Sequence, residues 1–140
     1  MKLICAFALA ATPALAGDFS TSYPYDGSFE DATFSVESAI VNAGLVIDYR
    51  SHTGEMLERT RADVGGEKLY DAADIFLFCS ATVSRQVMEA DPALIAFCPY
   101  GIYVSERDGQ VEIGYQNYPD GPMDAVEELL DGLVQEALAF

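Results

Sequence analysis

Residues 74–115 constrain the fold more than any other part of this 140-residue chain. Residues 75–79 (IFLFC) form a continuous apolar run, which is typical of a strand buried on both faces. Ser80 can cap a helix that follows this strand. Asp91-Pro92 ends that helix, because proline disfavours helical geometry at the residue before it.

The second half of this stretch predicts a pair of strands joined by a tight turn. Residues 94–98 are apolar again, and residues 102–104 continue the run beyond Pro99 and Gly101. Asp108-Gly109 is a strong hairpin signal, and apolar side chains alternate after it, as expected of a half-buried strand. We therefore predict the order strand, helix, strand, turn, strand.

The remaining chain adds two strands and three helices. Residues 18–26 predict a first, edge strand, and residues 45–49 predict the next one. Amphipathic helices are expected after a cap at Ser28, across residues 51–62 and at the C-terminus. The sequence predicts an α+β fold, a mostly antiparallel sheet of about five strands with three to four helices packed on one face.

The pattern C-S-A-x(6)-M-E-A-D-P-x-L-I-A-F-C-P-Y-x-I-Y-V-x-E-x-D-G-x-V resembles the domain of unknown function 302 family. The resemblance covers about residues 29–119. It implies a compact α+β domain, often paired as a homodimer, with no established activity. The chain departs from the family pattern in two places: Ser80-Ala81 replaces Asn-Pro, and Cys98 precedes its proline.

The N-terminus reads as a secretory signal peptide over residues 1–16. Lys2 provides the positive charge, residues 3–11 the apolar segment, and residues 14–16 (ALA) the small-residue cleavage motif. The apolar segment is too short to span a bilayer. Residues 17–140 are then expected to form one α+β domain, because about 124 residues suit a single domain.

The predicted mature chain is strongly acidic. Without Lys2, six basic and 23 acidic residues remain, which gives a formal charge of −17. Such a surface repels nucleic-acid phosphates and anionic membranes. We therefore expect no nucleic-acid partner and no membrane contact after signal cleavage.

Cys79 and Cys98 are the two cysteines of the predicted mature chain. In an exported protein such a pair usually forms a disulfide. Two alternatives stay open, since buried thiols are often inert and Cys79 precedes a predicted helix whose dipole favours a reactive or metal-binding thiolate.

His52 and Met56 stand four residues apart, on one face of a predicted helix. Together with Cys79 they are candidate ligands for copper or haem iron. The plain alternative is a core methionine beside a histidine at a helix start. No sequence motif identifies a cofactor, a nucleophile elbow, a phosphate loop or a dinucleotide site, so we predict no catalytic residue.

The scarce arginines suggest where a small ligand would bind. Arg50, Arg59, Arg61 and Arg85 lie in or beside the predicted helix 51–62 and the helix predicted after Ser80, so they predict a local positive pocket near His52 and Cys79. The alternative is that they only pair with surface carboxylates. The candidate ligand-binding residues are His52, Met56, Arg59, Cys79, Ser80 and Arg85.

These features predict an exported, periplasmic, small-ligand-binding or accessory domain that is non-catalytic. The alternative is a periplasmic redox or metal-handling protein, acting on copper or haem, that uses Cys79, Cys98, His52 and Met56.

Overall fold

The computed structural model describes residues 19–140, so the predicted signal peptide lies outside the described residues. The strands are β1 (Ser20–Tyr25), β2 (Ile47–Ser51), β3 (Ala72–Phe78), β4 (Tyr100–Arg107) and β5 (Gln110–Gln116). The helices are α1 (Phe29–Asn42), α2 (Thr53–Val64), α3 (Ala81–Ala90) and α4 (Asp124–Leu138), with one 3-10 helix, η1 (Pro92–Phe97).

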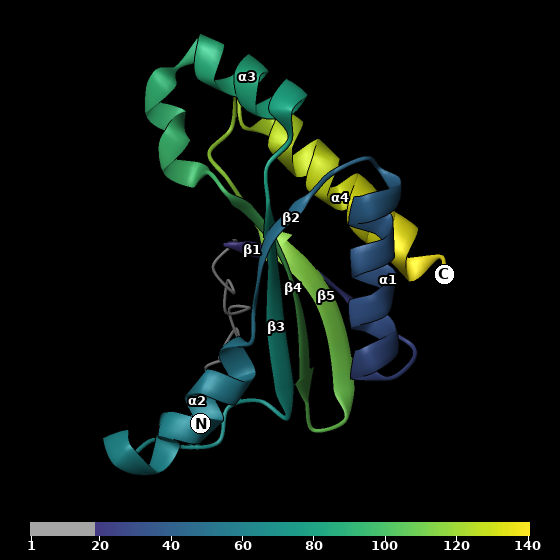
Figure 1. The fold of residues 1–140 in the computed structure, drawn as a ribbon, viewed down its shortest axis with the longest axis vertical. Helices are drawn as coiled ribbons and strands as arrows, with labels where there is room; N and C mark the ends of the chain where they lie inside the picture. Colours follow the sequence, from purple (N-terminus) through teal and green to yellow (C-terminus); the bar gives the residue numbers. More distant parts are fainter. Residues whose placement is uncertain (1–18) are drawn as a thin grey trace, which may run out of the picture.

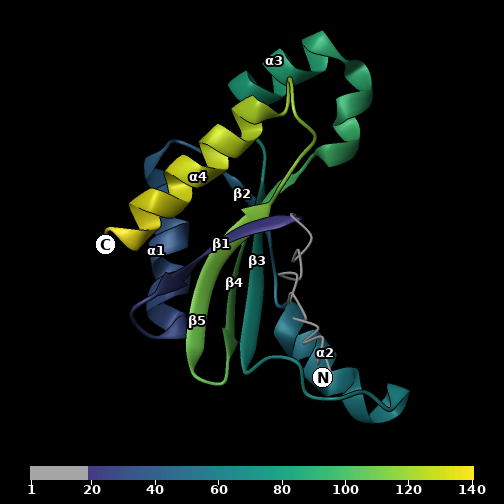
Figure 2. The same ribbon diagram turned by 180° about the vertical axis from the view of Figure 1, so that it is seen from behind.

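The five strands form one antiparallel sheet in the order β1-β5-β4-β3-β2. The first strand therefore lies at one edge, beside the last strand of the chain, as Figure 2 shows. Ser20 pairs with Gln116 and Tyr25 with Val111. The predicted α+β fold with a mostly antiparallel sheet is confirmed.

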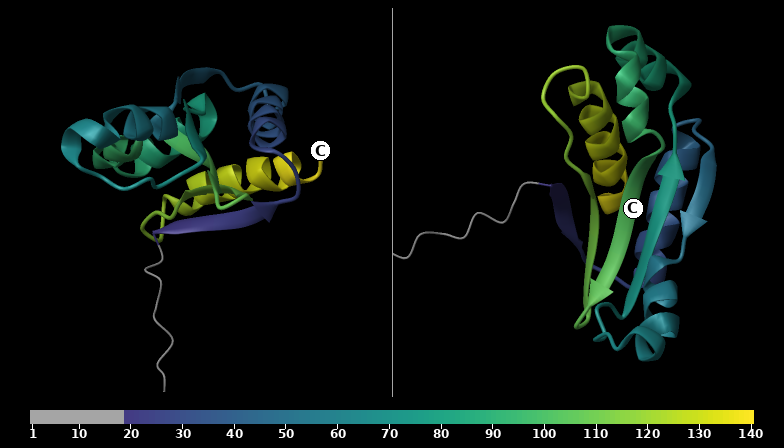
Figure 3. Two further views of the ribbon diagram at one scale, coloured as in Figure 1. Left: turned by 90° about the horizontal axis from the view of Figure 1, so that it is seen from below. Right: turned by 90° about the vertical axis from the view of Figure 1, so that its left-hand side faces the viewer.

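Helices α1 and α4 lie side by side across one face of the sheet (Figure 1). The right-hand view of Figure 3 looks onto the opposite face, which we call the open face, with α1 and α4 behind the strands. Helices α2 and α3 stand at opposite ends of the sheet (Figure 1). Within residues 19–140 the sheet thus has one covered face and one face that no helix crosses.

The core lies between the sheet and the α1–α4 pair, and it follows from the apolar stripes of both helices. Alternate strand residues, such as Phe76 and Phe78 of β3, point into it and are fully buried. Helix α1 contributes Ala32, Val36, Ala39 and Ile40, and α4 contributes Val126, Leu130, Leu133, Val134 and Ala137. Burying each large aliphatic side chain stabilises the fold by about 2 kcal/mol.

Two predicted helix caps are confirmed. The Ser28 side chain accepts a hydrogen bond from the backbone N–H of Asp31, and the Ser80 side chain accepts one from Val83. Each cap satisfies a backbone donor that the first turn of a helix leaves without an intrahelical partner.

The strand predicted to start at residue 94 is wrong in its first part. Residues 94–98 belong to η1 and its C-terminal cap, and β4 begins only at Tyr100. The Asp91 side chain accepts a hydrogen bond from the Ala93 N–H, and Pro92 takes the first position, so the chain starts a new helical turn. A short apolar run cannot distinguish such a turn from a strand.

Asp131 of α4 joins this helix to the edge of the sheet. Its Oδ1 accepts hydrogen bonds from the hydroxyls of Tyr23, at 2.7 Å, and Tyr115, at 3.1 Å. Burial first, and then the bond to Asp131, raise the pKa of Tyr115 to about 12. The bond to Asp131 also raises the pKa of Tyr23.

This contact predicts a loss of stability at alkaline pH. Both tyrosines must stay protonated to donate, so their contribution is complete below pH 10 and is lost as the pH rises toward 12. We expect Asp131→Asn to lower the free energy of unfolding at pH 7 by about 1 kcal/mol and to flatten its fall between pH 10 and 12. Urea denaturation at several pH values measures both.

Some alkaline dependence should survive in that variant, because burial also raises the pKa of Tyr118 to about 12. An Asp131→Asn protein whose pH profile matches the wild type would contradict this account.

Candidate functional site

Cys79 and Cys98, the two cysteines among the described residues, are joined by a disulfide. Cys79 follows β3 directly, and Cys98 follows η1, so the bridge closes the excursion that contains α3 and η1. The sequence left three states open for these sulfurs: a disulfide, inert thiols, and a reactive or metal-binding thiolate. The structure has the disulfide.

A buried carboxylate lies at the other end of β3. Asp74 is 6% exposed, and its Oδ2 accepts hydrogen bonds from Arg50 Nε at 2.8 Å and Nη2 at 2.7 Å. Its Oδ1 lies 3.0 Å from His52 Nδ1. The Arg50 guanidinium also lies 4.8 Å from the centre of the Phe76 ring. Asp74 thus holds the side chains of Arg50, near the end of β2, and of His52, the residue before α2.

A cavity of about 690 Å³ opens beside this cluster, between the N-terminal turns of α1 and α2. His52, Arg50 and Arg59 reach it. Five carboxyl groups line it as well: Glu30, Glu55, Glu58, Asp71 and Asp74. Acidic side chains therefore outnumber basic ones, so this cavity is not the positive pocket that the sequence predicted.

The arginines expected to create a positive pocket are paired with carboxylates instead. Arg59 lies 3.8 Å from Glu55, and Arg61 donates to Glu58 at 2.9 Å. Arg85 lies 3.6 Å from Glu89 on α3, and its side chain is 78% exposed. These three arginines therefore form surface ion pairs, which was the alternative that the sequence left open. Such exposed pairs contribute little to stability.

His52 and Cys79 do not share a pocket. Strand β2 runs antiparallel to β3, with Ser51 opposite Ile75 and Ile47 opposite Phe78. His52 therefore lies near the start of β3, whereas Cys79 lies beyond its end. Figure 1 accordingly shows α2 and α3 at opposite ends of the sheet. The expectation of one ligand site between them is not met.

The remaining candidates are dispersed too. Met56 is 42% exposed on α2 and does not line the cavity between α1 and α2. Ser80 is buried and caps α3. Among residues 19–140 there is no group of three or more His, Cys, Asp or Glu side chains arranged to hold a metal ion. The four donors of the redox or metal alternative do not meet in one place.

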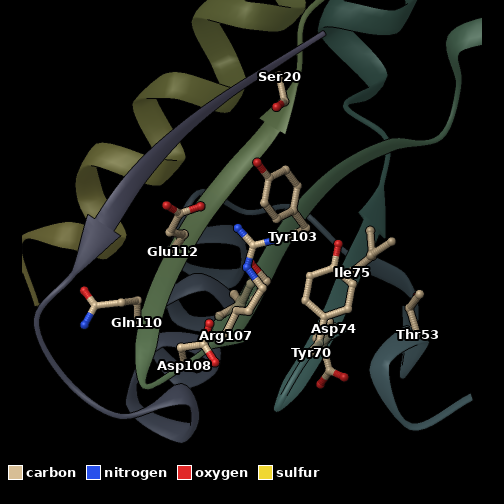
Figure 4. Close-up of a pocket in the computed structure, with 13 residues that line it drawn as sticks. Ser20, Thr53, Tyr70, Asp74, Ile75, Tyr103, Arg107, Asp108, Gln110 and Glu112 are labelled. Carbon is tan, nitrogen blue, oxygen red and sulfur yellow. The ribbon is translucent and has the colours of Figure 1, made fainter. Parts of the chain in front are cut away.

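A second cavity, of about 630 Å³, lies on the open face of the sheet (Figure 4). Its floor comes from β3, β4 and β5, with Ser20 of β1 on one side and Tyr70 and Thr53 on the other. Tyr103 and Ile75 supply apolar surface. Most of its other lining residues are polar or charged, and they include Ser105, Arg107, Asp108, Gln110 and Glu112.

Arg107 differs from every other basic residue in the described part of the chain. Residues 19–140 contain six lysines and arginines, and Arg107 alone forms no ion pair with a described carboxylate. Figure 4 shows its guanidinium between the side chains of Glu112 and Tyr70. The open-face cavity therefore offers one cation that has no protein counterion among these residues.

The sequence analysis missed this cavity, although a signal for it was present. The alternation that placed Val111 and Ile113 on the core face puts Gln110 and Glu112 on the opposite face. The same alternation places Tyr103, Ser105 and Arg107 on that face of β4. Read together across the Asp108-Gly109 turn, the outward residues of both strands would have predicted a polar and aromatic surface.

Comparison with known proteins gives a consistent family assignment. A crystal structure of the uncharacterized conserved protein DUF302 from Bacillus stearothermophilus is similar to this chain, with a TM-score of 0.61 and 16% sequence identity. The similarity covers 86% of this chain and 88% of that one, and it concerns the fold alone. No curated protein matches the chain.

The family model described as Domain of unknown function DUF302 matches residues 19–137, nearly the whole described chain. This chain therefore belongs to the DUF302 family.

Proposed function

We propose that this chain is an exported, non-catalytic domain that binds a small ligand on the open face of its sheet. The observation that carries the proposal is the 630 Å³ cavity with Arg107 on its wall. A cavity of this volume is in the range that small-molecule sites occupy, and mixed apolar and polar walls are usual for them.

Two features support export to an oxidising compartment. The N-terminus has the charge, apolar segment and cleavage motif of a signal peptide. Structural disulfides persist mainly in oxidising compartments, and Cys79 and Cys98 form one. Among the described residues, no helix is long and apolar enough to cross a bilayer.

Export makes a direct prediction about the mature N-terminus. When the full chain is expressed in a bacterium that exports it, the secreted protein should begin at Gly17, because Ala14 and Ala16 provide the small residues that cleavage needs. Intact mass and N-terminal sequencing measure the start. Secreted material that begins at Met1 would contradict the prediction.

Ligand binding is tested by NMR on isotopically labelled, oxidised residues 17–140. A panel of amino acids, simple carboxylic acids, amines and nucleosides should include members that shift the amides of β3, β4 and β5 around Ser105. Amides of α4 should stay unchanged. A panel that leaves the open-face amides unchanged, or that shifts only amides elsewhere, would contradict the proposal.

A blocking variant sharpens this test. Ser105→Phe adds a ring inside the cavity and should abolish the shifts. Ser38→Phe adds the same ring to α1, which packs on the other side of the sheet, and should leave them intact.

The homodimer that the family resemblance implies stays a prediction. The open face is a surface that a second copy could cover, and such a copy would compete with a small ligand for Tyr103 and Arg107. Sedimentation at several protein concentrations, with and without ligand, tests whether a dimer forms through the open face. If it does, a ligand that binds in the cavity should dissociate the dimer into monomers.

A further inference from the structure

The open-face cavity carries an unpaired charge of each sign. Arg107 forms no ion pair with a described carboxylate, and within residues 19–140 the carboxylate of Glu112 forms neither an ion pair nor a hydrogen bond with a side chain. Among the described residues, Arg107 thus lacks a counterion in a protein that has many carboxylates, and Glu112 on the same wall lacks a side-chain donor. The two side chains offer a ligand one positive and one negative group to bind.

The strand register fixes how these two charges stand to each other. Arg107 of β4 pairs with Gln110 of β5, and Ser105 pairs with Glu112. Arg107 and Glu112 are therefore diagonal neighbours on the same face, with Cα atoms about 7–8 Å apart in an ordinary sheet. A small molecule lying between them can reach both side chains at once.

The cavity also has an apolar wall next to these charges. Tyr103 lies opposite Gly114 of β5, and a Cβ at position 114 would lie 2.5 Å from Tyr103 Cζ, so the ring rests directly on the glycine backbone. Ile75 of β3 lies opposite Tyr103 on its other side. An aromatic ring and a branched aliphatic side chain thus give the cavity that contains Arg107 two apolar contributions to its lining.

We propose that this cavity binds a small zwitterion of the amino-acid type with an apolar or aromatic side chain. The ligand carboxylate pairs with Arg107, its ammonium group pairs with Glu112, and its side chain packs on Tyr103 and Ile75. The inference rests on the proposed binding function of the open face and names the class of ligand.

Ligands with only one charge suit this wall less well. A plain carboxylate would reach Arg107 but would also face Glu112 and Asp108, the second carboxylate at the rim. A plain amine would pair with Glu112 and leave Arg107 without a counterion. Because the rim adds a negative charge, we expect the amine to bind better than the carboxylate, and the zwitterion to bind best.

Three indole compounds test the inference: L-tryptophan, tryptamine, which lacks the carboxylate, and indole-3-propionate, which lacks the ammonium group. The protein contains no tryptophan, so indole fluorescence reports on the ligand alone. We expect tryptophan to bind about tenfold more tightly than tryptamine, as one charge-assisted hydrogen bond predicts, and indole-3-propionate to bind least tightly.

Two variants assign the two charges separately. Arg107→Gln should lower the affinity for tryptophan about tenfold and remove its advantage over tryptamine. Glu112→Gln should remove the advantage of tryptophan over indole-3-propionate. Arg85→Gln, a neutralised arginine on the exposed face of α3, is the matched control and should change neither. All three side chains are exposed, so the melting temperature should stay nearly constant.

The outcomes separate this inference from the proposal on which it rests. If the three compounds bind the open face equally, or if both advantages survive in the variants, the zwitterion class is wrong while binding at the open face stands. If tryptophan, phenylalanine and leucine all fail to bind while other panel members shift the same amides, the inference fails alone. If the responding amides lie elsewhere, both fail.

Discussion

Replacing both cysteines in the Cys79→Ser/Cys98→Ser variant is expected to lower the free energy of unfolding by about 3 kcal/mol. The bridge has a sequence separation of 19 and closes the whole α3–η1 excursion. In the chain-entropy model, a crosslink of this span stabilises the protein by reducing the freedom of the unfolded chain. Urea denaturation of the oxidised wild type and of the variant measures the difference.

The reduced wild type is the matched control for this experiment. With a thiol reductant present, its unfolding midpoint should fall to that of the double-serine variant, because both have lost the same crosslink. A variant as stable as the oxidised wild type would show that the bridge contributes nothing to folding.

Gly114→Ala is expected to lower the free energy of unfolding by about 2 to 3 kcal/mol, as overpacking in a well-packed site usually does. A Cβ at this position would lie 2.5 Å from Tyr103 Cζ and 2.7 Å from the backbone oxygen of Thr21. The tyrosine can move, but the Thr21 oxygen belongs to the backbone of β1. The edge strand must therefore shift to accept even one methyl group.

Gly132→Ala provides the opposite control in the same protein. Position 132 is an exposed site inside α4, where an added Cβ meets no atom within 4 Å. Alanine favours a helix over glycine by about 1 kcal/mol, so this variant should be more stable than the wild type. Thermal unfolding of both variants checks the contrast, and a Gly114→Ala protein as stable as the wild type would contradict the predicted clash.

The features that the sequence predicted well depend on neighbouring residues. The stripe of α4 repeats at helical spacing, and the caps at Ser28 and Ser80 act within three residues of themselves. The Asp108-Gly109 turn joins two adjacent strands, and the structure has β4 and β5 on either side of it. Such features depend on residues close together in the sequence, so the sequence could predict them, and the fold class was predicted from them.

The features that the sequence did not predict depend on pairing over long distances. In the sequence, Asp74 is only the residue before an apolar run. In the structure, antiparallel pairing of β2 with β3 brings the side chains of Arg50 and His52 within hydrogen-bond distance of its carboxylate. The same pairing carries His52 away from Cys79. Spacing along the chain cannot decide which of many acids an arginine will meet, so Arg107 could not be singled out as the unpaired one.

The position of β1 determines when the sheet can be completed. Its residues are made before those of the other four strands, yet Ser20 pairs with Gln116 of β5, the last strand in sequence order. Contacts this far apart in sequence form slowly, because a long loop must close before they stabilise anything. The N-terminal strand therefore has no partner while most of the chain is being made. The export that we propose would gain time from such an arrangement, since the sheet closes only after β5 has been made.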